Sequence, residues 1–325
     1  MKRLLSILGI VVTVTLGLCP PVFADEKIKI VVTIPPLADF VEHIGKDKVG
    51  VTVMIPTRAE PHTYEPTPQQ IKEVSQAKLY VKVGTAIEFE LFWLNKILSS
   101  NIPLCDSSAG IYFLTLDEDV NSKEHVLDCM KAAREEALAK ELLKPLSQRS
   151  VAARSPNLRR DISHGDPHIW LSVSNAIQMV NNIKKALMSI DAGNAIFYSQ
   201  NAEKYLSELQ VLREELKKDL EFYIGKSFLT VHPEWGYFAR EYQLEQISIE
   251  AQGKEPTADG LAKLIADADA KNVKMVLAAP QFSRKSADII AREIGAKVIM
   301  ADALSRNYIE NLRSLKKKMI EVWEQ

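Results

Sequence analysis

Two histidines and an aspartate fall within the short stretch His164–Ser172, near the middle of the chain. Pro167 fixes its own φ and disfavours helical geometry at Asp166, so this turn is stiff. His168 is presented from that backbone, and Asp166 is close enough in sequence to orient its imidazole ring. A metal-ligating histidine usually donates its second N–H to such an acceptor. The stretch therefore predicts a metal ligand at His168, although a polar turn that starts a helix would explain the same residues.

Three further residues that can bind a metal stand beside predicted strand ends. His62 lies on the polar loop after the second predicted strand, His232 directly follows a predicted strand, and Asp302 comes shortly after another. In open α/β sheets, ligands bind outside the carboxyl ends of the strands. We therefore predict that these three side chains meet His168 at one site.

Three imidazoles and one carboxylate make a closed four-ligand shell. This set suits Zn²⁺, with Zn–N distances of about 2.0–2.1 Å, whereas Mn²⁺ prefers more oxygen ligands and is the alternative. A zinc-dependent hydrolase, with Glu65 or Glu234 as the general base, is a hypothesis from a different class. Because Asp302 fills the fourth position, we expect a binding protein and not an enzyme.

Strands and helices alternate on both sides of one long amphipathic helix. The first run has predicted strands at 28–34, 51–55 and 79–83, with helices at 37–44, 69–76 and 88–98. The second has strands at 227–231, 244–249, 273–278 and 297–300, with helices that begin near 235, 257, 283 and 308. A repeated β-then-α order predicts parallel sheets with helices on their faces. The predicted fold class is therefore α/β, with two βα lobes.

The helix between the two runs is predicted from about Ala195 to about Tyr223. At a rise of 1.5 Å per residue it is about 40 Å long, which is more than one lobe needs. We interpret it as a rigid strut. The predicted domains are an N-terminal lobe at 25–193, a linking helix at 194–224 and a C-terminal lobe at 225–325.

Residues 1–24 are typical of a cleavable signal peptide. The basic pair Lys2-Arg3 precedes an apolar run over 4–18 that is short for a membrane span. Val22 and Ala24 then supply small residues at the positions that a signal peptidase requires. We therefore predict an exported, periplasmic protein. The formal net charge of -1 gives no electrostatic reason to expect nucleic-acid binding.

Residues 117–162 interrupt the βα alternation and are predicted to form a surface insertion, either a solvated connection or a basic strip that binds a partner. Two cysteines follow the signal peptide, Cys105 and Cys129. An even pair in an oxidising compartment suggests a disulfide worth about 3 kcal/mol. Two free buried thiols are the alternative.

Six short motifs occur along the chain: Glu60-Pro-His-Thr-Tyr-Glu-Pro66, Asp166-Pro-His-Ile-Trp-Leu171, His232-Pro-Glu-Trp-Gly-Tyr-Phe-Ala239, Gly253-Lys-Glu-Pro256, Pro280-Gln-Phe-Ser283 and Asp302-Ala-Leu304. In type and order they resemble the periplasmic solute-binding proteins of bacterial zinc and manganese ABC importers, the cluster A-I family. The resemblance implies two βα lobes linked by one long rigid helix, with the metal site in the cleft between the lobes. A histidine at 232 is similar to zinc-type members, since manganese-type members more often have a glutamate there.

The same resemblance implies a function. It implies capture of a divalent transition metal, foremost Zn²⁺, and delivery to the membrane permease of an ABC importer by a monomer. A Mn²⁺ or Fe²⁺ protein of the same family is the alternative, and a surface adhesin that binds metal is a third class. The metal ligands that the resemblance implies are His62, His168, His232 and Asp302.

Overall fold

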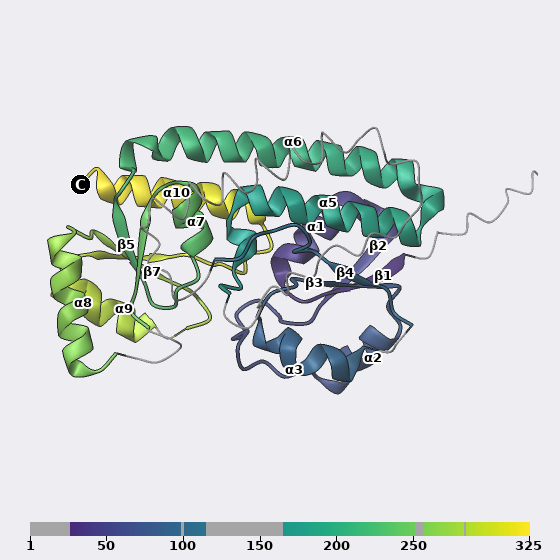
Figure 1. Cartoon of the computed structure of the whole chain (residues 1–325), viewed down its shortest axis with the longest axis horizontal. Coiled ribbons are helices and arrows are strands. Elements are labelled where there is room, and N and C mark those ends of the chain that lie inside the picture. The colour runs from purple at the N-terminus through teal and green to yellow at the C-terminus, as the bar shows by residue number, and fades with distance from the viewer. Residues whose placement is uncertain (1–26, 99–100, 115–164, 251–255, 283) are drawn as a thin grey trace, which may run out of the picture.

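The structure is a computed structural model, and it describes residues 27–98, 101–114, 165–250, 256–282 and 284–325 (Figure 1). The predicted signal peptide, the predicted insertion and Cys129 lie outside the described residues. Cys105 is buried, with a free thiol. Among the described helices, none is long and apolar enough to cross a lipid bilayer.

The first sheet is parallel, with the strand order β2-β1-β3-β4. Its strands are β1 (Ile28–Val32), β2 (Val49–Val53), β3 (Leu79–Lys82) and β4 (Leu104–Asp106). The helices of this run are α1 (Pro35–Gly45), α2 (Pro68–Ser75) and α3 (Glu88–Ile97). Helix α1 lies on the face of the sheet toward the long helices, while α2 and α3 lie on the other face (Figure 1). Strand β4 was not predicted.

One side chain fixes both ends of the loop that carries His62. Thr67 is the N-cap of α2, and its hydroxyl accepts the N–H of Gln70 while Gln70 Oε1 accepts the N–H of Thr67 at 2.9 Å. This reciprocal pair is a capping box. Gln70 Nε2 also donates to the carbonyl oxygen of Met54 at 2.6 Å, just past β2. The loop between β2 and α2 is therefore closed at its base.

Two long helices follow the His168 turn. The turn leads into a 3₁₀ segment, Ile169–Leu171, and then into α5 (Val173–Ile190) and α6 (Ala195–Leu220). Helix α6 has 26 residues, which corresponds to about 39 Å. Figure 1 shows it along the top of the molecule, with α5 beneath one half and α10 beneath the other. The predicted helix is confirmed, and its last residues form a 3₁₀ turn at Glu221–Tyr223.

The second sheet repeats the topology of the first, with the parallel order β6-β5-β7-β8. Its strands are β5 (Ser227–Thr230), β6 (Glu245–Ser248), β7 (Met275–Ala278) and β8 (Lys297–Met300). Its helices are α7 (Gly236–Glu241), α8 (Ala258–Ala270), α9 (Arg284–Glu293) and α10 (Tyr308–Trp323). The predicted α/β fold of two parallel-sheet lobes joined by a long helix is confirmed.

The lobes are also joined by direct packing, which was not predicted. A single hydrophobic core runs from the first sheet through α5 and α6 to α7 and α10, and a smaller core lies under α8 and α9. Trp170 Nε1 donates to the carbonyl oxygen of Ala303 at 2.7 Å. The Tyr308 hydroxyl donates back to the carbonyl oxygen of Trp170, also at 2.7 Å. These buried bonds fix the His168 turn against the C-terminal lobe.

Candidate metal centre

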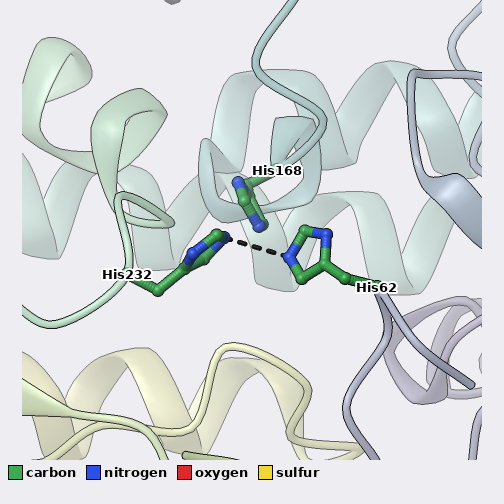
Figure 2. A group of neighbouring side chains, drawn as sticks. All are labelled: His62, His168 and His232. Atoms are coloured by element: carbon green, nitrogen blue, oxygen red, sulfur yellow. Dashed lines mark hydrogen bonds between the residues drawn. The ribbon is translucent and has the colours of Figure 1, made fainter. Parts of the chain in front are cut away.

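Three histidines from distant parts of the chain point toward one another (Figure 2). His62 comes from the loop between β2 and α2, His168 from the turn before α5, and His232 from the end of β5. One ring nitrogen of each lies within 4.8 Å of the others. The Nε2 atoms of His62 and His232 are 3.1 Å apart. Two nitrogens on one tetrahedral Zn²⁺ ion would be separated by about 3.3–3.4 Å, so the spacing is close to that of a zinc site.

Each of the three rings is held at Nδ1 by a carboxylate. A neutral imidazole that donates from Nδ1 carries its lone pair on Nε2, the atom that faces the centre of the cluster. The carboxylates therefore select the tautomer and the ring orientation that metal binding requires. The three pairs, with their Nδ1–O distances, are His62–Glu88 at 2.7 Å, His168–Asp166 at 2.8 Å and His232–Glu250 at 3.2 Å.

The surroundings push the pKa values of two of these rings in opposite directions. Burial lowers the pKa of His62, but the hydrogen bond to Glu88 and the nearby carboxylate charges outweigh it, so the net pKa is raised. Burial lowers the pKa of His232 to about 2, assisted by repulsion from His168 and His62. The low pKa keeps His232 neutral at physiological pH, and the raised pKa of His62 makes a proton on that ring a competitor of a cation.

The rings border a small cavity of ≈ 20 Å³, which is room for one water molecule or one ion. Trp170 and Phe282 also line it, and the His232 ring stacks on Phe282 with centroids 5.3 Å apart. Glu234 is buried at the same cavity, and burial raises the pKa of its carboxyl to about 8. It accepts the indole N–H of Trp235 at 3.1 Å. The cavity therefore combines nitrogen donors with a largely apolar wall.

Asp302 stands apart from the three rings. It does not belong to the group of ligand atoms that lie within 4.8 Å of one another. Its Oδ1 accepts the side-chain amide of Gln281 at 2.8 Å and the N–H of Leu304 at 3.0 Å. Its charge nevertheless contributes to the raised pKa of Glu234, so the carboxylate is near the cavity. The structure thus brings together the three predicted histidines, but Asp302 does not join their group of ligand atoms.

Glu88 and Glu250 were not predicted from the sequence as site residues. Glu88 is the first residue of α3, shortly after β3, and Glu250 follows β6 by two residues. Both obey the rule that drew attention to the histidines, namely a position just past the carboxyl end of a parallel strand. A position just past a predicted strand could therefore have identified these two carboxylates as well as the histidines.

A family model described as the zinc-uptake complex component A, periplasmic (ZnuA), matches residues 30–322. The high-affinity zinc uptake system protein ZnuA of Bacillus subtilis is 30% identical over 282 residues, covering 86% of this chain and 79% of that protein. A crystal structure of ZnuA superposes with a TM-score of 0.74 and 35% identity, covering 91% of this chain and 99% of that one. A ZnuA deletion mutant with zinc bound gives 0.74 and 34%, covering 91% and 98%.

Proposed function

The chain belongs to the family of periplasmic zinc-uptake components that the ZnuA model describes, and on this premise we propose that it captures Zn²⁺ outside the cytoplasm for an ABC importer. One observation carries the proposal. Three imidazole Nε2 atoms converge from both lobes, each ring oriented by its own carboxylate. Such a nitrogen-rich set suits Zn²⁺ better than Mn²⁺.

The proposed ligands are His62, His168, His232 and Asp302. Asp302 would bind through its second oxygen, Oδ2, because its Oδ1 accepts two hydrogen bonds from within its own lobe. The ion would then be held by two residues of the proposed N-terminal lobe, 25–193, and two of the proposed C-terminal lobe, 225–325. The mutant ZnuA structure with zinc bound supports the choice of metal, as does the name of the Bacillus subtilis relative.

The ion is a cargo in this proposal, and the protein is a carrier. The family is one of solute-binding proteins of metal ABC transporters and not of enzymes. The partner would be the membrane permease of such an importer. We further propose that residues 1–24 are removed on export and that the mature protein is a monomer that binds no nucleic acid.

Elemental analysis of the protein purified without added metal tests the proposed function. We expect one zinc per chain, and we expect Zn²⁺ to displace Mn²⁺ and Fe²⁺ in competition. The matched control is a variant in which His62, His168 and His232 are all replaced by alanine, which should bind no zinc. Retention of Mn²⁺ or Fe²⁺ in the presence of equimolar Zn²⁺ would contradict the assignment of the metal.

A further inference from the structure

The three histidine–carboxylate pairs differ greatly in exposure. In the His62–Glu88 pair the side chains are 26% and 39% exposed. The corresponding values are 11% and 19% for His232–Glu250, and 10% and 6% for His168–Asp166. His62 and its anchor are therefore the most accessible part of the site.

His62 lines two spaces. One is the small cavity shared with the other two histidines. The second is an open depression of ≈ 330 Å³ on the surface of the N-terminal lobe, which we call the outer hollow. Of the three histidines, His62 alone lines both spaces. The residues that line the outer hollow are His62, Thr63, Tyr64, Glu65, Glu88, Phe89, Phe92, Trp93 and Lys96.

The other two rings are held from several sides. The carboxylate of Asp166 accepts both the ring Nδ1–H and the backbone N–H of His168, at 2.8 and 2.9 Å. The next residues of that turn are buried in the core shared by the lobes. The His232 ring is covered on one face by Phe282. Displacing either ring would disrupt buried structure, whereas the His62 ring has the outer hollow beside it.

Helix α3, which supplies several residues to the lining of the outer hollow, is anchored at its start. Glu90, in the first turn of α3, is buried and accepts the hydroxyl of Thr33 at 2.6 Å. It also accepts the N–H groups of Val83 and Gly84, at 2.6 and 2.9 Å. These bonds hold the start of α3, and with it Glu88, at the carboxyl ends of β1 and β3. We therefore expect the His62 ring, and not the helix, to move.

We propose that zinc enters and leaves the site through the outer hollow, by rotation of the His62 ring away from Glu88. In this role Glu88 is a positioning residue that holds the ring in its binding orientation and thereby limits the rate of exchange. The inference rests on the proposed function, because it requires that the three histidines bind zinc. Beyond that function, the inference gives the path of the ion and names Glu88 as the residue that controls the rate of exchange.

A bulky label in the outer hollow tests the route. In a background with Cys19→Ser and Cys129→Ser, a fluorescein maleimide is attached at Lys96→Cys, which lines the hollow. The matched control carries the label at Asn95→Cys, an exposed neighbour on the same helix outside the lining. The remaining Cys105 is buried, and burial raises the pKa of its thiol to about 12, so it does not react.

Stopped-flow measurements of zinc uptake, and of release to a chelator, give the two rates. The label at Lys96→Cys should slow both by about tenfold and leave the equilibrium affinity unchanged, because an obstructed path affects both directions equally. The label at Asn95→Cys should change neither rate. Equal rates in the two labelled proteins, or a change confined to one direction, would overturn the route. An unlabelled background that binds no zinc would instead contradict the proposed function.

A second pair of variants tests the role of Glu88. Glu88→Gln keeps the shape of the side chain but removes the charge that holds the Nδ1–H, and Glu250→Gln does the same at the covered ring. We expect Glu88→Gln to speed zinc release about tenfold more than Glu250→Gln, with unchanged thermal stability of the metal-free protein. Release that is equally fast in both variants would show that Glu88 has no special control of exchange.

Discussion

The loop that carries His62 and the turn that carries His168 both precede α6 and supply the same kind of side chain, yet they are held differently. The His168 turn is continuous with the shared core, and Trp170 within it is bonded to the opposite lobe. The His62 loop is anchored at its base by Gln70, but its ring and its carboxylate partner face the surface. The His168 ring is part of the interior, and the His62 ring lies at its edge.

If both histidines bind zinc as proposed, this difference allows a carrier to bind an ion firmly and still release it. Tight binding needs preorganised ligands, which the buried His168–Asp166 pair would provide. Release needs at least one ligand that can leave without unfolding its surroundings, since buried elements open only at a cost close to global unfolding. The proposed site would combine the two requirements by placing them on different segments.

Alanine at each histidine should give the largest effects. His62→Ala and His168→Ala should each weaken zinc binding by about a thousandfold or more, because each removes one bond from a small shell. Only His168→Ala should also destabilise the metal-free protein, by about 1–3 kcal/mol, since it leaves the buried Asp166 carboxylate without its ring donor. Zinc competition and urea unfolding measure the two quantities. If His62→Ala and His168→Ala lost equal free energy of unfolding, the two segments would not differ in how firmly they are held.

Changes to the orienting carboxylates should have intermediate effects. Asp166→Asn and Glu88→Gln should each weaken zinc binding by about 10- to 100-fold, the usual range for a group that orients a metal ligand. The loss should be accompanied by lower thermal stability for Asp166→Asn alone, because that carboxylate is buried. The melting temperatures of the metal-free variants, compared with the parent, check this. Wild-type affinity in both variants would show that the carboxylates do not orient the rings.

The pH dependence should also distinguish the more accessible ring, His62, from the covered ring of His232. Zinc binds neutral imidazoles, so a proton on His62, whose pKa is raised, must leave before the ion binds. Affinity should therefore fall as the pH is lowered from about 7.5 to 5.5, by about tenfold per pH unit for each competing proton. His62→Ala should flatten this slope, whereas His232→Ala should not, because the pKa of His232 is about 2. Affinity of the parent that is constant over this range would contradict a histidine site.

The smallest expected effect is on overall shape. The lobes share one buried core and a continuous α6, so metal loading should order the His62 side of the site and tilt the lobes by about a few degrees only. Small-angle scattering should show nearly the same radius of gyration for metal-free and zinc-loaded protein. A large decrease would mean that α6 acts as a hinge and that the proposed linker, 194–224, has to be redrawn.

Much of the fold could be predicted from the sequence, because the signals are local. The bounds of β8 and α10 match the predicted residues at 297–300 and from 308, since each element has a clear periodic pattern and a defined end. Strand β4 was missed because it has only three residues, and two of them are exposed. Strand β4 therefore lacks the repeating pattern of apolar residues from which a buried strand is predicted.

The arrangement of the site could be predicted only in part. The rule about strand ends brought His62 and His232 to one place although they are 170 residues apart. It did not reveal which carboxylate orients which ring, because that depends on distances between loops. The bond between Tyr308 and Trp170 spans 138 residues and depends on how two lobes pack. The apolar face of a helix indicates that this face is buried, but it does not identify the surface against which the helix packs.

Anomalous diffraction at the zinc edge, from crystals of the zinc-loaded protein, would locate the bound ion directly. We expect one strong peak about 2.0–2.1 Å from the Nε2 atoms of His62, His168 and His232, with their Nδ1 atoms still bonded to the three carboxylates. Asp302 should approach as the fourth ligand. A peak elsewhere, or a peak that contacts fewer than three of these histidines, would contradict the proposed metal centre.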